Sequence, residues 1–251
     1  MKAGLFMSGE WREDGPPLVL LHGLAGTHRV WDRVRAALGG TVSTLAYDLP
    51  GHGGSLIHAQ DMKASPAARA VLADLRDRGI DRFHLAGHSF GGAVAALMAL
   101  AEPDRVASLT LFAPGGIGPE INAPLLRSYA SAETREEIAS CLAAMSARAP
   151  SEKMIEDALQ MRASTGQMEA LARLCAAITR NGNQGVIARE ELAGLAMPVH
   201  VAWGGKDPVL PPRQADNLPH RFVRHLFPGL GHMLPEEAPE EMAQLLLSRH
   251  S

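Results

Sequence analysis

Short runs of apolar residues alternate along the chain with longer segments in which apolar residues recur every three or four positions. Residues 18–21 are continuously apolar, which is typical of a strand buried on both faces of a parallel sheet. Similar runs predict further strands at 41–47, 83–86, 106–112, 198–203 and 221–227. Helices are predicted at 30–38, 65–78, 92–100, 213–217 and 239–249. The alternation predicts an α/β fold, a mostly parallel sheet with helices on both faces.

The stretch 118–192 departs from this pattern, because it contains helix-forming residues throughout and no strand pattern. Its helical runs are interrupted at 149–151, 164–166 and 181–183. We interpret it as a helical lid inserted between two strands of a core domain formed by residues 1–117 and 193–251. The first sixteen residues predict only a short edge to the sheet.

The composition is that of an ordinary globular protein, with 251 residues, 46% hydrophobic and 20% charged residues, and a net charge of −3. The absence of a basic block argues against nucleic acid as a partner. Apolar runs too short for a membrane span or a signal peptide, and two cysteines at Cys141 and Cys175, predict a cytoplasmic protein. We expect it to act on a small molecule, and formation of a homo-oligomer is compatible with the sequence.

The strongest chemical signal is the run Gly-His-Ser-Phe-Gly-Gly at 87–92, between a predicted strand and a predicted helix. A G-x-S-x-G pattern in this setting is a nucleophile elbow, a sharp turn that presents the serine at the carboxyl edge of the sheet. A Cβ at Gly87 or Gly91 would collide with the neighbouring helix and strand. Ser89 is therefore the predicted nucleophile.

A serine hydroxyl needs a general base, and the base needs an acidic residue to orient it. In this architecture the chain order is serine, then aspartate or glutamate, then histidine. Asp207 follows a predicted strand in Trp-Gly-Gly-Lys-Asp-Pro, and His232 follows the next strand in Gly-Leu-Gly-His-Met. We predict that Ser89, Asp207 and His232 are the catalytic residues.

Two backbone N–H groups should face the negative charge that develops during attack. We predict those of Phe90, directly after the nucleophile, and Leu24, in the loop after the strand 18–21. The histidines form no H-E-x-x-H motif, and the glycines form no phosphate-binding loop. We therefore expect neither a metal nor a cofactor.

Six segments together resemble the α/β-hydrolase superfamily. They are Leu-His-Gly at 21–23, Trp-Asp at 31–32, Tyr-Asp-Leu-Pro-Gly-His-Gly at 47–53, Gly-His-Ser-Phe-Gly-Gly at 87–92, Trp-Gly-Gly-Lys-Asp at 203–207 and Gly-His-Met at 231–233. The segment 107–122 more narrowly resembles the hydrolase-like catalytic domain of the acetoin dehydrogenase dihydrolipoyl acyltransferase component. The outline is also similar to 3-oxoadipate enol-lactonases and to meta-cleavage product hydrolases. The resemblance implies the α/β-hydrolase fold.

Candidate substrate-binding residues lie in the insertion and near the nucleophile. Met154 and Met161 are seven positions apart and share one helix face, and with Met145 they form an adaptable apolar lining for a pocket under a lid. The alternative for these methionines is ordinary packing between helices and sheet. His22 and His88 are further candidates, with a structural hydrogen-bonding role as the alternative for His22.

These features lead us to expect a serine hydrolase that cleaves an ester, thioester, lactone or activated C–C bond of a small organic acid. The reaction would pass through an acyl-enzyme or a tetrahedral oxyanion intermediate. One alternative is an acyltransferase with the same triad, and another is a low-turnover ligand-binding member of the fold. The acyltransferase family carries a lipoyl domain ahead of this one, for which we expect no room here, so hydrolysis is the leading hypothesis.

Overall fold

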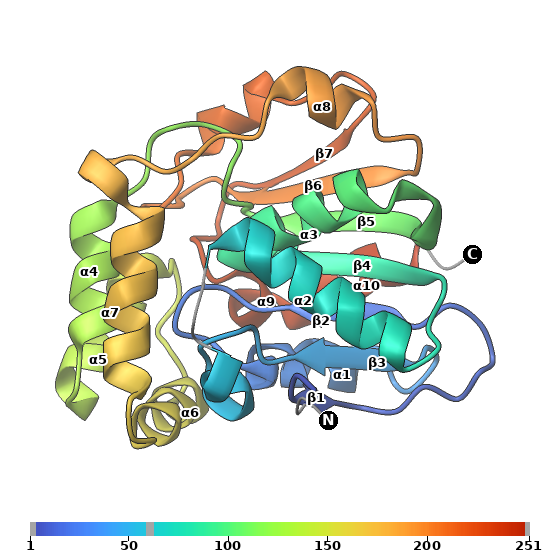
Figure 1. Ribbon diagram of the computed structural model, residues 1–251. Helices are drawn as coiled ribbons and strands as arrows, with labels where there is room; N and C mark the ends of the chain where they lie inside the picture. Colours follow the sequence, from blue (N-terminus) through green and yellow to red (C-terminus); the bar gives the residue numbers. More distant parts are fainter. Residues whose placement is uncertain (1–3, 59–62, 249–251) are drawn as a thin grey trace.

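The computed structural model describes residues 4–58 and 63–248, so residues 1–3, 59–62 and 249–251 of the predicted core domain lie outside it. Its centre is a seven-stranded sheet in the order β1-β3-β2-β4-β5-β6-β7 (Figure 1). The strands are β1 (Met7–Ser8), β2 (Leu18–Leu21), β3 (Thr44–Tyr47), β4 (Phe83–His88), β5 (Val106–Phe112), β6 (Val199–Gly204) and β7 (Val223–Phe227). Only β1 pairs antiparallel with its neighbour among these strands. The mostly parallel sheet with a short first strand is therefore confirmed.

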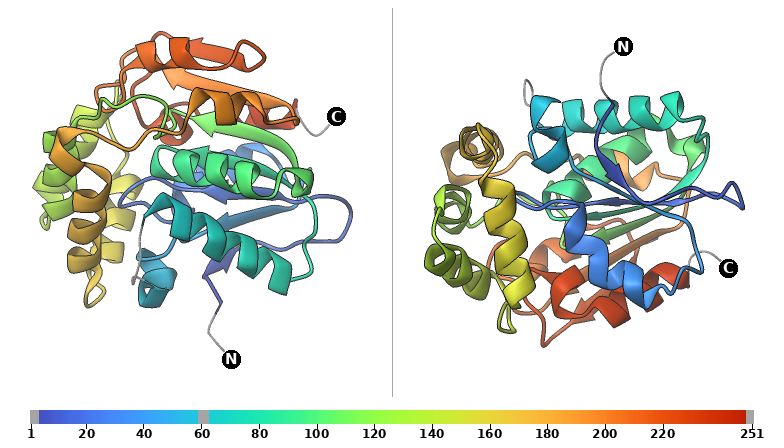
Figure 2. Two further views of the ribbon diagram at one scale, coloured as in Figure 1. Left: turned by 45° about the horizontal axis from the view of Figure 1, so that its top comes forward. Right: turned by 90° about the horizontal axis from the view of Figure 1, so that it is seen from below.

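Helices cover both faces of this sheet (Figure 2). On one face lie α2 (Ala64–Asp77) and α3 (Phe90–Ala101), and on the other lie α1 (Asp32–Ala37), α9 (Leu234–Glu237) and α10 (Pro239–Leu247). Short 3₁₀ helices join these elements: η1 (His28–Trp31), η2 (Gly53–His58), η3 (Pro103–Arg105), η4 (Arg180–Gly182) and η5 (Pro212–Asn217). The predicted helix 30–38 is thus divided into η1 and α1, and residue 249 of the predicted last helix lies outside the described residues.

One strand boundary differs from its prediction for a local reason. The strand predicted at 41–47 begins only at Thr44. Gly39 and Gly40 have φ of 62° and 71°, and the N–H of Thr41 donates to the carbonyl of Leu38 at 3.2 Å. The turn therefore includes Thr41, the first residue of the predicted strand, and the strand starts later than predicted. Glycine is favoured at positions 39 and 40 because both have positive φ.

Between β5 and β6 the chain forms α4 (Ala123–Ser131), α5 (Arg135–Met145), α6 (Glu152–Arg162), α7 (Gln167–Ile178) and the short α8 (Arg189–Ala193). The first four, which we call the cover helices, stand together at the carboxyl end of the sheet, whereas α8 lies against α3 (Figures 1 and 2). All but the last residue of α8 falls within the predicted insertion 118–192. No helix within residues 4–58 and 63–248 combines the length and apolar character needed to cross a membrane.

A buried arginine ties the cover helices together. The guanidinium of Arg162 donates to the carbonyl oxygens of Ala132, Ala158 and Tyr129 at 2.9, 3.0 and 2.8 Å. It also lies 4.8 Å from the centre of the Tyr129 ring. Burial of an arginine is costly unless its donors are used, and here carbonyls at the ends of α4 and within α6 use them. Arg162 therefore fixes the mutual position of α4 and α6 next to the site.

Candidate active site

Ser89 occupies the sharp turn between β4 and α3. Its φ and ψ are 53° and −117°, a conformation that costs energy for any residue with a Cβ and that is typical of functional sites. A Cβ at Gly87 would overlap the backbone carbonyl of Gly91, and a Cβ at Gly91 would overlap that of His22. The predicted need for both glycines is confirmed, since the turn closes only when backbone meets backbone here.

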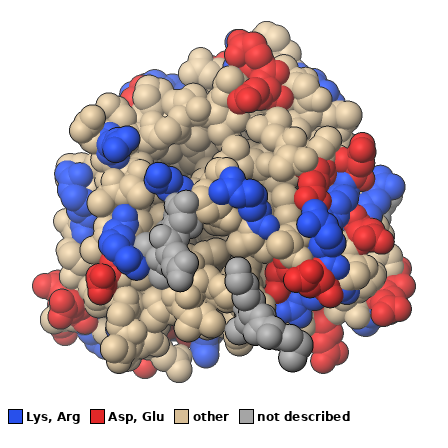
Figure 3. All heavy atoms as spheres, viewed as in Figure 1, with Lys and Arg blue, Asp and Glu red and all other residues tan. Residues whose placement is uncertain are grey.

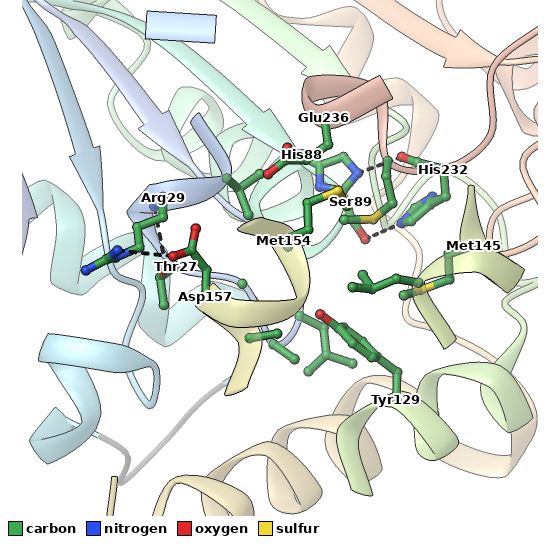
Figure 4. Close-up of a pocket in the computed structure, with 18 of the residues that line it drawn as sticks. Thr27, Arg29, His88, Ser89, Tyr129, Met145, Met154, Asp157, His232 and Glu236 are labelled. Carbon is green, nitrogen blue, oxygen red and sulfur yellow. Dashed lines mark hydrogen bonds and ion pairs between the residues drawn. The ribbon is translucent and has the colours of Figure 1, made fainter. Parts of the chain in front are cut away.

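The structure brings the three predicted residues together from separate strand ends. The Oγ of Ser89 lies 3.0 Å from Nε2 of His232, and Nδ1 of His232 lies 2.8 Å from Oδ2 of Asp207 (Figure 4 shows the Ser89–His232 contact). All three residues are buried. Because the carboxylate accepts the proton on Nδ1, Nε2 is left to accept the serine proton. The arrangement can therefore remove a proton from Ser89.

Backbone groups hold Asp207 in this position. Its Oδ1 accepts the N–H groups of Val209 and Leu210 at 2.8 and 2.9 Å, which leaves Oδ2 for His232. β6 ends at Gly204, and only Gly205 and Lys206 separate it from Asp207, so a short turn places the carboxylate at the carboxyl edge of the sheet. Both carboxylate oxygens have partners, which offsets the cost of burying this charge.

The loop that carries His232 is fixed to the core and to the cover helices. The backbone N–H of His232 donates to the carbonyl of Met145 at 2.8 Å. The backbone carbonyl of His232 accepts the Nε2–H of His88, also at 2.8 Å. The buried carboxylate of Glu237 accepts N–H groups of Gly231, Met233 and Ala147, the shortest contacts being 3.0, 3.0 and 2.8 Å. Sequence reasoning missed Glu237, although an acidic residue near a helix start was the available signal.

His88 is neutral in this arrangement. Burial and the neighbouring His232 lower the pKa of His88 to about 3. Its Nε2–H is engaged by the His232 carbonyl, while the ring itself lines the cavity next to Ser89 (Figure 4). His88 therefore lies where a substrate would bind, but its donor positions the His232 loop.

The predicted oxyanion groups lie on either side of Ser89. Phe90 is the first residue of α3, and the first N–H groups of a helix have no partner inside the helix. The loop with Leu24 passes so close that a Cβ at Gly23 would lie 3.1 Å from that of Ser89. Within residues 4–58 and 63–248, neither the Leu24 nor the Phe90 N–H donates to a protein acceptor. The two N–H groups are therefore available for an oxyanion, and this role stays a prediction.

Two cavities meet at Ser89. The first, which we call the His232 cavity, has a volume of about 50 Å³ and includes His88, Ser89 and His232 in its lining. The predicted methionines Met145, Met154 and Met161 line it from the cover helices, as do Tyr129, Leu142 and Ala158. The second, which we call the apolar cavity, has a volume of about 370 Å³ and lies on the side of Phe90, whereas Leu24 lines both cavities.

Comparison with known proteins identifies the family. The sequence profile of the Alpha/beta hydrolase family matches residues 18–245. The chain belongs to this family. The predicted fold class and the resemblance are therefore confirmed.

Relatives of this α/β hydrolase are named for different functions. It is 37% identical over 238 residues to the dihydrolipoyllysine-residue acetyltransferase component of an acetoin cleaving system from Pseudomonas putida. The aligned region covers 94% of this chain and 64% of that protein. The same component from Cupriavidus necator is 31% identical, over 91% of this chain and 62% of that protein. The chain thus spans less than two thirds of either acetyltransferase component. A 2-hydroxy-6-oxononadienedioate/2-hydroxy-6-oxononatrienedioate hydrolase from Burkholderia vietnamiensis is 29% identical, over 92% and 85%.

Solved structures share the fold of this α/β hydrolase at low identity. A meta-cleavage product hydrolase from Pseudomonas fluorescens has a TM-score of 0.82 at 18% identity, covering 98% of this chain and 92% of that one. A carboxylesterase from Bacillus subtilis has a TM-score of 0.78 at 22% identity, covering 97% and 86%. The α/β-hydrolase fold is shared at this level of identity.

The charged groups of the His232 cavity come from both the core and the cover helices of the α/β hydrolase. Arg29, in η1, pairs with Asp157, in α6, at 3.1 Å (Figure 4). Glu236 enters the same cavity from α9, and burial raises the pKa of its carboxyl to about 7. Among the described residues that line this cavity, Arg29 is the one Lys or Arg side chain, and it is already paired with a carboxylate.

His22 is placed differently from the other predicted site residues. It is fully buried, its Nδ1 lies 2.7 Å from the carbonyl oxygen of Gly23, and its Nε2 accepts the N–H of Leu49 at 2.9 Å. Burial lowers the pKa of the imidazole, so the ring is neutral. Neither cavity at Ser89 is lined by His22. Both ring nitrogens contact the backbone, and this favours the structural hydrogen-bonding role of His22 over substrate binding.

Proposed function

We propose that this α/β hydrolase is a serine hydrolase with Ser89 as nucleophile, His232 as general base and acid, and Asp207 as the residue that orients His232. The observation that carries the proposal is the buried chain of contacts, 3.0 Å from Ser89 to His232 and 2.8 Å from His232 to Asp207. Pure ligand binding does not need such a chain, whereas activation of a serine does.

The geometry supports a two-step reaction. His232 takes the Ser89 proton as Oγ attacks the carbonyl carbon, and the negative charge forms on the carbonyl oxygen between the N–H groups of Leu24 and Phe90. His232 then gives its proton to the leaving atom, which breaks the bond and leaves an acyl group on Ser89. Water, deprotonated by His232, attacks this acyl-enzyme and restores Ser89. Asp207 stabilises the positive imidazole in both steps.

The bond cleaved is an ester, thioester, lactone or activated C–C bond of a small organic acid. Each of these offers a carbonyl carbon to the serine and a leaving group that His232 can protonate. The hydrolase and carboxylesterase relatives support this range. Both cavities are bounded by the core and the segment between β5 and β6, which favours a small molecule over a polymer.

Acyl transfer is the second candidate, favoured by the 37% identity with the acetyltransferase component. It would share the acyl-enzyme and differ only in its final step, where a thiol or alcohol replaces water. Adding a small dithiol during turnover of a thioester and measuring transferred acyl against free acid separates the two. We expect free acid to dominate.

The test of the proposed function is turnover of p-nitrophenyl acetate by Ser89→Ala. Removing the nucleophile should lower kcat at least about 10⁴-fold, to near the background rate. Ser128→Ala, an exposed serine on α4, is the matched control and should keep the wild-type rate. Activity of Ser89→Ala within tenfold of wild type would refute the assignment.

A further inference from the structure

Ser89 stands at the boundary between two cavities that differ in their chemistry. His232 lines only the His232 cavity, together with the charged residues Arg29, Asp157 and Glu236. The apolar cavity, about seven times larger, lies on the other side of Ser89. A carbonyl carbon bound to Ser89 has two substituents besides its oxygen, and each cavity receives one of them.

The position of His232 decides which substituent goes where. The imidazole must give a proton to the leaving atom, so that atom has to lie within hydrogen-bond reach of Nε2. The leaving group therefore lies in the His232 cavity. The acyl substituent then extends past Phe90 into the apolar cavity.

We propose, on the basis of the proposed function, that the apolar cavity is the acyl-binding site and selects uncharged acyl groups of medium length. The leaving group, held in the much smaller His232 cavity, is small or reaches out to solvent. The substrate class is thus an ester or thioester of an apolar carboxylic acid.

The lining of the apolar cavity supports an uncharged acyl group. Its walls come from α3, the loop after β5, α4, the end of α7 and the segment between α7 and α8, and include Leu97, Ile121, Leu126, Ile178 and Ile187. Its charged lining residues, Lys63 and Glu191, are both exposed and of opposite sign. On the face seen in Figure 3, the surface between α7 and α8 is made mostly of residues without charge.

Besides Ser89, Gln184 supplies an uncharged polar side chain to the described lining of this cavity, and its amide group already has partners. The Oε1 of Gln184 accepts the N–H of Gly116 at 3.0 Å, and its Nε2 donates to the carbonyl of Gly118 at 2.8 Å. A carboxylate placed deep in the cavity would therefore find no free buried donor among these groups, and its desolvation would be costly. The His232 cavity is no better for an anion, because Arg29 is paired with Asp157.

The test compares methyl esters of different acyl groups by titration of the acid released. Methyl hexanoate has four more methylenes than methyl acetate, and full burial of each strengthens binding about fourfold, which is about 250-fold in total. We expect methyl hexanoate to exceed methyl acetate in kcat/KM by at least about 30-fold. Monomethyl adipate, in which a carboxylate replaces the terminal methyl group of the hexanoyl chain, should be at least tenfold poorer than methyl hexanoate. Equal values for the three esters would overturn the proposal.

Filling the cavity should remove the preference. Ile187→Trp should lower kcat/KM for methyl hexanoate at least about 30-fold while methyl acetate stays within threefold. Ile57→Trp, at an exposed isoleucine in η2, is the matched control and should keep the wild-type ratio. Ile178→Trp repeats the test from α7 in case Ile187→Trp does not fold. An unchanged ratio in a folded cavity variant would overturn the proposal.

A binding experiment separates this proposal from the proposed function. Calorimetry with Ser89→Ala should show hexanoate binding at least tenfold more tightly than acetate, and Ile187→Trp in the same background should abolish the difference. If wild type cleaves esters but shows neither preference, only the acyl assignment fails. If wild type cleaves no ester while hexanoate still binds in the Ile187-dependent manner, the proposed function fails and the binding site stands.

Discussion

The strand-end loops of the core and the cover helices build the same site by different means. In the loops, backbone geometry sets the positions: Ser89 has a φ of 53°, and Asp207 is held by the N–H groups of Val209 and Leu210. On the cover helices, side chains such as Met154 and Met161 supply adaptable apolar surface.

This difference separates chemistry from selectivity. A change in a strand-end loop should reduce the turnover of every substrate, because each reaction uses the same proton path. A change in the helical segment between β5 and β6 should instead alter which substrates are preferred. The predictions below test this division, beginning with the largest expected effect.

Asp207→Asn should lower kcat about 10⁴-fold for short and long acyl esters alike. The asparagine can keep its oxygen toward the N–H groups of Val209 and Leu210, and its NH₂ group then donates to Nδ1 of His232. The imidazole is left with its proton on Nε2, so it cannot accept the serine proton. Steady-state kinetics with two acyl lengths measures this.

The matched control for this variant is Asp216→Asn, at an exposed aspartate in η5. It should leave kcat within twofold of wild type. If Asp207→Asn loses less than tenfold, or loses activity toward one acyl length only, the proposed role of the strand-end loops is wrong.

Glu237→Gln tests the junction between the two regions. The amide NH₂ would face one of the backbone N–H groups that now donate to this carboxylate, which costs about 1–3 kcal/mol and displaces the His232 loop. We expect kcat to fall about 10–100-fold while KM changes less than threefold, since the cavity walls stay in place.

Separate measurement of kcat and KM distinguishes positioning of His232 from general loss of structure. Glu240→Gln, at an exposed glutamate of α10, is the control and should change neither constant. A Glu237→Gln variant that raises KM at unchanged kcat would show that this residue serves the cavity walls instead.

The smallest expected effect concerns Glu236, whose ionisation should make the stability of the folded protein depend on pH. Burial raises the pKa of its carboxyl to about 7, above the ordinary value of 4.5. Between pH 4.5 and 7 the folded state keeps a proton on Glu236 that the unfolded state has lost. Relative to high pH, this difference adds to the free energy of unfolding; the added stability is fully present below pH 4.5 and is lost as the pH rises through 7. The charged groups that also act on it are Arg33, Asp157, Lys153 and Asp32.

Glu236→Gln removes this ionisation. Its Tm should match that of wild type near pH 4.5 and exceed it by several degrees at pH 8, which corresponds to on the order of 2 kcal/mol. Glu190→Gln, at an exposed glutamate of α8, should follow wild type at both pH values. Parallel Tm curves for wild type and Glu236→Gln would contradict the assigned ionisation.

The core and its three convergent residues were predictable because they depend on short-range rules. Continuous apolar runs mark strands buried on both faces, as at β2, and the glycines at 87 and 91 mark a turn that no other residue can close. The chain order of Ser89, Asp207 and His232 follows from the order of the strands that carry them. These signals lie within a few residues of each position.

The rest of the site depends on packing between distant segments. Ile178 and Ile187 carry no local pattern that distinguishes cavity wall from core, and their role emerges only where α7 and the following loop meet α3. Glu237 holds the His232 loop by accepting three backbone N–H groups, and no sequence motif indicates these contacts. For His22, the sequence left two alternatives open, and the contacts with Gly23 and Leu49 favour the structural role.

Covalent labelling tests the central claim most directly, that His232 and Asp207 make Ser89 a nucleophile. A fluorophosphonate probe reacts with an activated serine and leaves a mass increment that peptide mass spectrometry can place. We expect one adduct per chain, on Ser89, and a strongly reduced labelling rate in Asp207→Asn. An adduct on another serine, or an unlabelled Ser89 in folded wild-type protein, would contradict the account.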